Sequence, residues 1–314
     1  MLFRSDVKDE MCRIPATCSH CNRSLLSALI RIEGTLHLAS GSYRLEIATD
    51  SILVGRLLIK LIHELYHLKT DFTVRQSVLH KTQNYLIELP PQPGLTDALA
   101  DLGIITASGG LEFGIKPDLI RKQCCAAAYL RGAFLGSGFI ASPRGDFHFE
   151  IAVSGRELAE GLVGILNDRE IPAKMVQRRN TFVVYLKSGE AICDVLAMTG
   201  AHQCALRMEN ERVYKSMRND VNRKTNAEVA NQGKTVDSAV RQVFAIRKVV
   251  DEYGVENLPT ALQEYIRLRV SHPEASLQEL GEYANPKLSK SAIYHRVRRI
   301  EQMAAGIDER KSRR

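Results

Sequence analysis

The sequence predicts an α+β protein, in which a pseudo-twofold N-terminal domain of two helix-strand-strand-helix-strand-strand repeats precedes an all-α helix-turn-helix domain. Three observations carry this prediction. The same order of apolar helical and alternating segments occurs twice before residue 203. Basic charge is concentrated after residue 204. The last part of the chain combines helix-capping residues with an apolar stripe at helical spacing.

The two repeats are expected at about 22–115 and 120–203, within a domain of residues 1–203. Each begins with an apolar helical stretch that ends in Gly, LSALIRIEG and LRGAFLGSG. Alternating segments predict strands at 35–39, 43–49, 72–79 and 84–89, and again at 139–142, 147–153, 173–178 and 181–186. Helices are expected at 51–68, 155–169 and 189–200. The alternative is that the two leading helices are unrelated buried helices.

Small residues on the two leading helices have a packing explanation. Ala28 in the first, and Gly132 and Gly136 in the second, would let two helix backbones approach closely. We therefore expect these helices to pack against each other.

The seven cysteines are expected to be reduced, because the polar N-terminus does not resemble an export signal. Cys18 and Cys21 flank two residues, and Cys12 lies just upstream, which is half of a possible zinc site. No second pair follows at a suitable spacing, and the adjacent Cys124 and Cys125 begin an apolar helix. The pattern favours buried thiols over a metal site, and we expect no cofactor.

Charge is divided unevenly along the chain. Residues 1–203 hold 22 Lys and Arg against 21 Asp and Glu, whereas residues 204–314 hold 21 against 15. The basic excess indicates a polyanionic partner for the C-terminal part, although charge alone does not separate DNA from RNA or an anionic membrane. No apolar run reaches the length of a membrane span, so we expect a cytoplasmic protein.

A helical linker is expected at 204–255. Its first helix is rich in basic residues, which either contact phosphate or form a solvated face. Gly233 predicts a break, followed by a second helix at about 236–252.

The helix-turn-helix domain is expected at 256–314, with the motif itself at about 275–305. Thr260 with Gln263, and Ser276 with Glu279, fit the capping box, which predicts helices at 260–271 and 276–284. Asn285-Pro286 ends the second helix, because proline cannot continue it. Ser289 can then cap a third helix at about 289–304.

The third helix is predicted to read DNA. Ile293, Val297, Ile300 and Ala304 form a narrow apolar stripe that would pack inward. The segment 287–299 has no acidic residue, as a helix in a major groove requires. The candidate DNA-binding residues are Lys287, Ser289, Lys290, Ser291, Tyr294, His295, Arg298 and Arg299. The alternative is a small three-helix bundle with a solvated basic face.

The two repeat helices resemble the paired LAGLIDADG helices of homing endonucleases. In active members of that family, an acidic residue before the last Gly of each helix binds a divalent metal. The first repeat keeps a carboxylate at Glu33, but the second has Ser137, whose neutral hydroxyl cannot replace it. The resemblance therefore predicts a nuclease scaffold without nuclease activity, although a metal-dependent endonuclease remains the alternative.

The sheet that binds DNA in such endonucleases is not strongly basic here. Its basic residues lie among acidic neighbours, and this leaves a protein or a small ligand as an equally open partner for the domain. These basic residues are Arg44, Arg75, Lys81, Lys174, Arg178 and Arg179.

Taken in order, four segments resemble the bacterial WhiA family: LIRIEGTL at 29–36, AYLRGAFLGSGFI at 128–140, NRKTNAEVANQGKT at 222–235 and LSKSAIYHRVRRI at 288–300. This resemblance implies a non-enzymatic, nucleoid-associated regulator of transcription. It further implies a role in cell division, chromosome segregation and, in sporulating bacteria, sporulation. The expected partner is double-stranded DNA, and a protein is a candidate partner of the N-terminal domain. A protein-interaction scaffold with secondary DNA contact is the remaining alternative.

Overall fold

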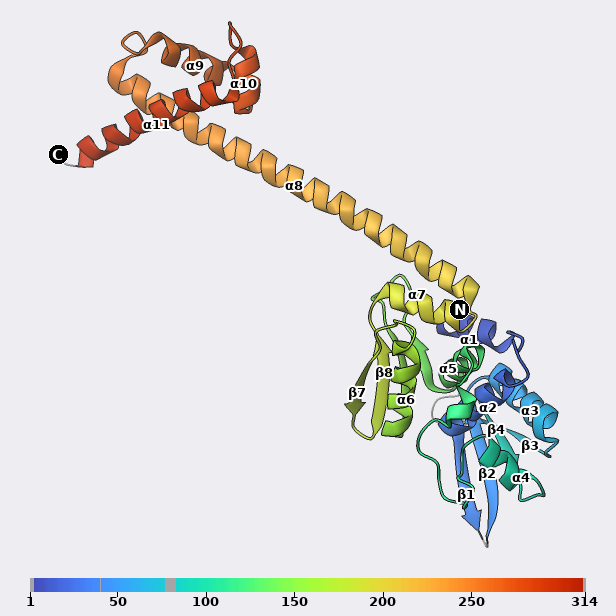
Figure 1. Ribbon diagram of the computed structural model, residues 1–314. Coiled ribbons are helices and arrows are strands. Elements are labelled where there is room, and N and C mark those ends of the chain that lie inside the picture. The colour runs from blue at the N-terminus through green and yellow to red at the C-terminus, as the bar shows by residue number, and fades with distance from the viewer. Residues whose placement is uncertain (1–2, 40, 77–82, 313–314) are drawn as a thin grey trace. The chain divides into compact units, whose positions relative to one another are not determined.

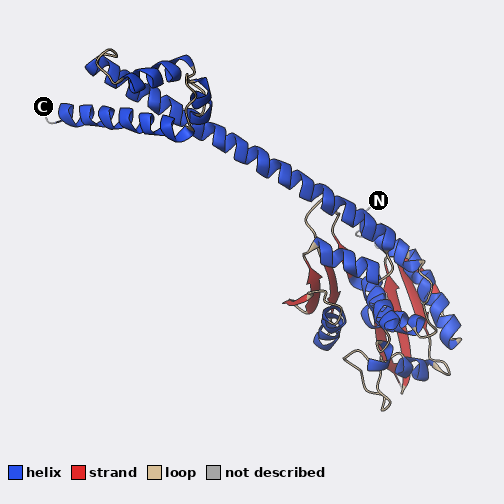
Figure 2. Cartoon of the chain, turned by 45° about the horizontal axis from the view of Figure 1, so that its top comes forward, coloured by secondary structure: helices blue, strands red, loops and turns tan. Residues whose placement is uncertain are grey.

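We describe the protein from a computed structural model, which covers residues 3–39, 41–76 and 83–312. The chain divides into two compact units, Met1–Lys215 and Ser216–Arg314, and the boundary lies inside helix α8 (Figure 1). All strands of the described residues belong to the first unit, whereas the second is built of helices (Figure 2). The predicted fold class is therefore confirmed.

The N-terminal unit contains two four-stranded antiparallel sheets, with strand orders β1-β2-β4-β3 and β5-β6-β8-β7. The first half consists of α1 (Phe3–Cys12), α2 (Cys21–Glu33), β1 (Gly34–Ala39), β2 (Ser42–Thr49), α3 (Ile52–Tyr66), β3 (Asp71–Gln76), β4 (Gln83–Leu89) and α4 (Leu95–Asp101). The second half consists of a short 3₁₀ turn (Pro117–Leu119), α5 (Gln123–Ser137), β5 (Gly138–Ile140), β6 (Phe149–Val153), α6 (Arg156–Asn167), β7 (Lys174–Arg178), β8 (Thr181–Leu186) and α7 (Gly189–Met198).

The two halves repeat each other in strand register as well as in element order. Gly34 at the end of α2 pairs with Ile47, and Gly138 at the end of α5 pairs with Ile151. The expected strand at 72–79 is observed as far as Gln76, and its last three residues lie outside the described chain. The sequence did not predict α1 or α4, because both are short and α1 has a weak apolar stripe.

Helices α2 and α5 pack directly against each other at the centre of this unit, as the small residues predicted. A β-carbon added to Gly132 would lie 2.4 Å from the backbone oxygen of Leu25 and 3.0 Å from the β-carbon of Ala28. One added to Gly136 would lie 2.9 Å from the side chain of Ile32. The two backbones approach as closely as they do because these positions carry no side chain.

Helix α8 (His202–Tyr253) is continuous, so the break predicted at Gly233 is wrong. A glycine inside a helix costs only about 1 kcal/mol relative to alanine, which the helix-forming residues around it offset. Apart from the neighbouring backbone of α8 itself, no atom lies within 4 Å of a β-carbon added to Gly233, so close packing does not require a glycine there either.

The C-terminal unit packs the end of α8 with α9 (Thr260–Ser271), α10 (Leu277–Tyr283) and α11 (Lys290–Ser312). The predicted helix boundaries at 260 and 271 agree with α9, and α11 extends beyond the expected residue 304. Among the described helices, none has an apolar stretch long enough to cross a lipid bilayer.

The capping box predicted at Thr260 is wrong, whereas the one at Ser276 is confirmed. Helix α9 is preceded by Pro259, which has no capping side chain, and the amide of Gln263 donates to the backbone oxygen of Leu258. Ser276 accepts a hydrogen bond from the backbone of Glu279, whose carboxylate accepts one from the backbone of Ser276 in return. Thr260 is itself the first residue of the helix, so its side chain is not at the cap position.

Candidate nucleic-acid interface

The helix-turn-helix is formed by α10, a short turn and α11. The turn is held by a hydrogen bond of 2.9 Å from the backbone nitrogen of Leu288 to the backbone oxygen of Gly281. A side chain at Gly281 would collide with that part of the turn, because an added β-carbon would lie 2.2 Å from the oxygen of Leu288. Ser289 accepts a hydrogen bond of 3.2 Å from the backbone of Ala292, and thereby caps α11 as predicted.

The two faces of α11 differ as the sequence predicted. The apolar residues Ile293, Val297, Ile300 and Ala304 are buried in the core of the C-terminal unit. All eight candidate DNA-binding residues are exposed, namely Lys287, Ser289, Lys290, Ser291, Tyr294, His295, Arg298 and Arg299. We call these eight exposed residues together the α11 surface.

Arg296 has a structural role, although it belongs to the same basic run. Its guanidinium forms an ion pair of 2.7 Å with Glu264 on α9, and its side chain is only 17% exposed. Arg298, by contrast, is 60% exposed and reaches Glu301 only at 4.0 Å, so its guanidinium remains accessible to solvent. An exposed pair at that distance contributes little to stability.

A buried arginine fixes the connection that leads into α10. The Nη1 atom of Arg269, on α9, donates to the backbone oxygen of Ala275 at 2.6 Å and to those of His272 and Pro273 at 3.4 Å. Beside it, the hydroxyl of Tyr265 donates to the side-chain oxygen of Gln242 on α8 at 2.9 Å. These bonds hold the start of α10 against α8 and α9, which positions the turn and α11.

Sequence reasoning missed one residue near this surface, Lys234. It is exposed on α8, and it lines the same shallow pocket as Ser276 and Lys290. Lys234 belongs to the segment 222–235, which the sequence analysis had singled out. Its proximity to α11 could not be predicted, because it depends on how α8 packs in the C-terminal unit.

The sheets of the N-terminal unit carry balanced charge at the positions where a DNA clamp would be basic. Arg44 pairs with Glu46 at 3.1 Å and also with Glu88, and Arg178 lies 3.4 Å from Glu150. Of the other predicted basic positions, Arg75, Lys174 and Arg179 are exposed, and Lys81 lies outside the described residues.

The positions that correspond to the catalytic metal ligands do not fit a divalent cation. Glu33 and Ser137 are equivalent, since each is the last residue of its helix and is followed by an extended Gly. The Ser137 hydroxyl is buried and has no hydrogen-bond partner. The ammonium group of Lys8 lies beside them, where it donates to the backbone oxygen of Gly136 at 3.2 Å and lies 3.8 Å from Asp50.

The electrostatics of this site favour a neutral carboxyl rather than a metal ligand. Burial raises the pKa of Glu33 to about 7, against the opposing attraction of Lys8. Burial also lowers the pKa of Lys8 below its usual range, although Asp50 partly compensates. The two equivalent helix ends supply one carboxyl and one hydroxyl instead of the paired carboxylates that divalent metal catalysis uses, and the nearby Asp50 carboxylate faces the ammonium group of Lys8.

The structure corrects one part of the cysteine analysis. Cys124 and Cys125 lie next to Cys18 and Cys21, so a second pair does accompany the first despite the long separation in sequence. A backbone hydrogen bond at His20 lowers the pKa of Cys18 to about 6, whereas burial raises the pKa of Cys125 to about 12. Cys12, which was considered with the first pair, is not part of this group.

Together, the fold and these sites define a class of protein in which a degenerate LAGLIDADG-type unit is followed by a helix-turn-helix unit. Three family profiles match the chain in the same order. They are described as the WhiA N-terminal LAGLIDADG-like domain at residues 19–105, the WhiA LAGLIDADG-like domain at 126–218 and the WhiA C-terminal HTH domain at 221–304.

Curated relatives match along nearly the whole chain. The chain is 41% identical over 308 residues to a probable cell division protein WhiA of Desulforudis audaxviator, with 98% of each chain covered. It is 40% identical to the protein of the same name from Alkaliphilus metalliredigens, with 97% of this chain and 98% of the relative covered. The chain therefore belongs to the WhiA family.

Solved structures agree with this assignment. The crystal structure of full-length WhiA from Thermotoga maritima matches with a TM-score of 0.60 at 26% identity, covering 97% of this chain and 98% of that one. The N-terminal LAGLIDADG domain of WhiA, solved separately, matches with a TM-score of 0.51 at 23% identity, covering 63% of this chain and 90% of that one, and supports the fold of the first unit.

Proposed function

We propose that this protein is a non-enzymatic regulator that binds double-stranded DNA through the α11 surface. The observation that carries the proposal is the separation of the two faces of α11. Its apolar stripe is buried against α8, α9 and α10, which leaves basic and hydroxyl side chains free to enter a major groove.

The residues of the α11 surface include two groups with different proposed roles. Arg298 and Arg299 are long and exposed, and can donate to guanine edges or to phosphates. Ser289, Lys290 and Ser291 lie at the start of the helix, where backbone N–H groups and the helix dipole favour a phosphate. Lys234 on α8 adds a further cation beside Lys290.

The names of the relatives support a biological setting for this binding. Those proteins are described as probable cell division proteins, and we propose that this chain controls genes or chromosomal sites that serve cell division and chromosome segregation. Transcriptional control, association with the nucleoid in the cytoplasm, and a role in sporulation where the host sporulates are part of the same proposal.

The proposal is tested by replacing both Arg298 and Arg299 with alanine and measuring binding to duplex DNA over a range of salt concentrations. We expect affinity to fall by about tenfold or more, and the slope of log affinity against log salt to become shallower by up to about 2, because two phosphate or base contacts are lost.

The matched control replaces Arg178 and Arg179, an adjacent basic pair at the end of β7 and in the turn that follows it. This variant loses the same formal charge, and we expect its affinity and salt slope to stay close to those of the unchanged protein. A control that weakens binding as much as the α11 variant does would show that the sheet contacts DNA, and would contradict the proposal.

Absence of nuclease activity is the second part of the proposal. It is supported by the hydroxyl of Ser137 and by the ammonium of Lys8 at the positions where the fold would hold metal ions. We expect no nicking when plasmid DNA is incubated with excess protein and Mg²⁺ or Mn²⁺. Cleavage that depends on the metal and disappears on Glu33→Gln substitution would establish the endonuclease alternative.

The N-terminal unit is then available for a protein partner. The ion pairs of Arg44 and Arg178 with neighbouring glutamates give its sheets little net charge, which suits a protein surface better than DNA. This role remains a proposal alongside the binding of DNA by the C-terminal unit.

A further inference from the structure

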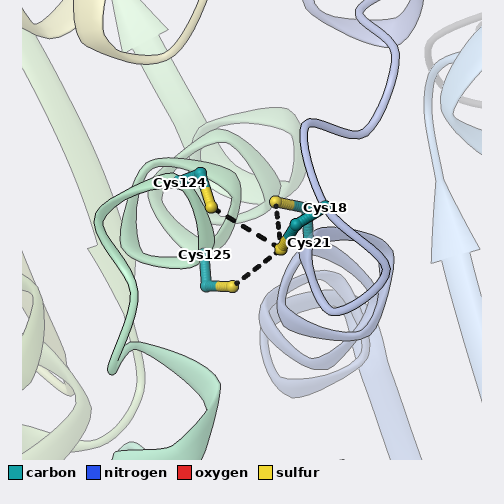
Figure 3. A group of neighbouring side chains, drawn as sticks. All are labelled: Cys18, Cys21, Cys124 and Cys125. Atoms are coloured by element: carbon teal, nitrogen blue, oxygen red, sulfur yellow. Dashed lines mark hydrogen bonds between the residues drawn. The ribbon is translucent and has the colours of Figure 1, made fainter.

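Four cysteines from two distant parts of the chain meet at one end of the N-terminal unit. Cys18 and Cys21 lie just before and at the start of α2, and Cys124 and Cys125 lie in the first turn of α5. Because α2 and α5 pack side by side, their N-terminal ends bring the two pairs together (Figure 3).

The separations between the sulfur atoms fit a single tetrahedral metal ion. The Sγ atom of Cys18 lies 3.4 Å from that of Cys21 and 3.6 Å from those of Cys124 and Cys125. All four sulfur atoms lie within 4.8 Å of one another. A zinc ion bound at about 2.3 Å by four thiolates spaces them about 3.8 Å apart, which agrees with this arrangement.

Other uses of the four thiols fit less well. All four are free, and their separations are far longer than the roughly 2.05 Å of a disulfide. An iron–sulfur cluster divides the four thiolates between two irons or among four, which spreads the sulfur atoms more widely than is observed here. Four thiolates in tetrahedral array are the ligand set of structural zinc sites.

The surroundings can also balance the charge of such a site. Four thiolates around Zn²⁺ carry a net charge of −2, and the N-termini of both α2 and α5, with their positive dipole ends, lie at the cluster. The guanidinium of Arg131 is buried two turns along α5 and is coupled electrostatically to Cys21. A surface pocket lined by Thr17, Gln123 and Cys124 gives an ion access from solvent.

We propose that Cys18, Cys21, Cys124 and Cys125 bind one Zn²⁺ ion as a closed structural site that fastens the two repeat helices together at their N-terminal ends. On binding, the thiols release their protons to solvent. The site is separate from the vestigial position at Glu33, since the length of α2 between Cys21 and Glu33 is about 18 Å. Its role is therefore structural and independent of the function proposed above.

The direct test is the metal content of the full chain, purified under reducing conditions and measured by inductively coupled plasma mass spectrometry. We expect about one zinc ion per chain. Substitution of both Cys124 and Cys125 by serine should abolish it, because two of four ligands are lost. The matched control replaces Cys193 and Cys204, which lie outside the cluster, and should keep the zinc.

A second measurement tests the proposal even if the cluster variant does not fold. The unchanged full chain is treated with a chelator under reducing conditions and titrated with Co²⁺ alone. We expect the visible absorption of tetrahedral cobalt–thiolate coordination, saturating near one equivalent and displaced by Zn²⁺. Thermal unfolding of the N-terminal unit should occur at a lower temperature after chelation and recover when Zn²⁺ is restored.

Four results would overturn the proposal. Three of them are purified protein without zinc whose four thiols give no cobalt spectrum, a disulfide within the cluster under the same reducing conditions, and stoichiometric iron with the absorption of an iron–sulfur cluster. Loss of zinc from the Cys193 and Cys204 control alone, with zinc retained in the cluster variant, would place the metal elsewhere and have the same consequence.

Discussion

Glu33 and Lys8 are two ionisable side chains held in a largely buried environment at the ends of the repeat helices. Burial opposes the charge of each, as the raised pKa of Glu33 and the lowered pKa of Lys8 indicate. Asp50 stabilises the ammonium group from 3.8 Å, and Arg4 lies at the same distance from Asp50. The site resembles an internal network of charges more than a binding site for a cation from solution.

Glu33→Gln should stabilise the N-terminal unit at alkaline pH. The carboxyl titrates near 4.5 in the unfolded chain and near 7 in the folded one, so folding binds a proton between these values. Stability therefore falls as pH rises from about 4.5 to 7 and stays reduced above pH 7, by about 3 kcal/mol. The glutamine variant avoids this loss.

Urea unfolding of both proteins at pH 5 and pH 8 measures the effect. We expect the advantage of the variant to be small at pH 5 and larger at pH 8. A variant that is less stable than the unchanged protein at pH 8 would show that the attraction between Glu33 and Lys8 outweighs burial.

Individual residues were predictable from the sequence where their role depends on local periodicity. The buried stripe that includes Ile293 and Val297 follows from helical spacing alone. The position of Lys8 beside Ser137, and the meeting of Cys18 with Cys124, depend on contacts between segments more than 100 residues apart. Sequence periodicity carries no information about such contacts, which is why both were missed.

At the scale of elements, the two predicted capping boxes show how far local sequence signals can be relied on. Both fit the same pattern, but only Ser276 forms the reciprocal bonds, since α9 begins one residue earlier than a cap at Thr260 requires. The order of helices and strands in both repeats was predictable because alternation and helical spacing recur there. The sequence did not predict that α8 is continuous, because we expected Gly233 to end a helix, whereas a single glycine destabilises a helix only weakly.

Ser276→Ala should destabilise the C-terminal unit by about 1 kcal/mol, because the cap of α10 is lost. Thr260→Ala is the matched control and should be close to neutral, because Thr260 is exposed at the first position of α9, where it is not the cap. Thermal unfolding of both variants measures the difference. Equal losses in the two variants would mean that Thr260 also acts as a cap in solution.

For the whole molecule, the main feature is the presence of two hydrophobic cores that share no residue. The core of the first unit ends at Met208, and that of the second begins at Ile246. Between Met208 and Ala239, no described side chain is buried. A polar helix of this kind gains little from tertiary packing, so the stability of each unit depends on its own core.

The two units should therefore work as separate fragments cut between Lys215 and Ser216. We expect residues 216–314 to fold alone and bind duplex DNA with a salt dependence close to that of the full chain, because the α11 surface lies entirely within them. Residues 1–215 should fold but bind DNA weakly. Circular dichroism and a salt titration of each fragment measure this, and strong binding by 1–215 would contradict it.

The ammonium group of Lys8 also bears on how this protein could evolve. A single change of Ser137 to an acidic residue would seem to restore the missing member of a pair. That carboxylate would arise next to the Gly136 carbonyl to which Lys8 donates, so the lysine would neutralise it before any ion from solution could bind. Metal binding at this position would thus require Lys8 to be lost as well, which would leave Asp50 paired with Arg4, at 3.8 Å. Each change alone brings no advantage, so a metal site here would require both changes together.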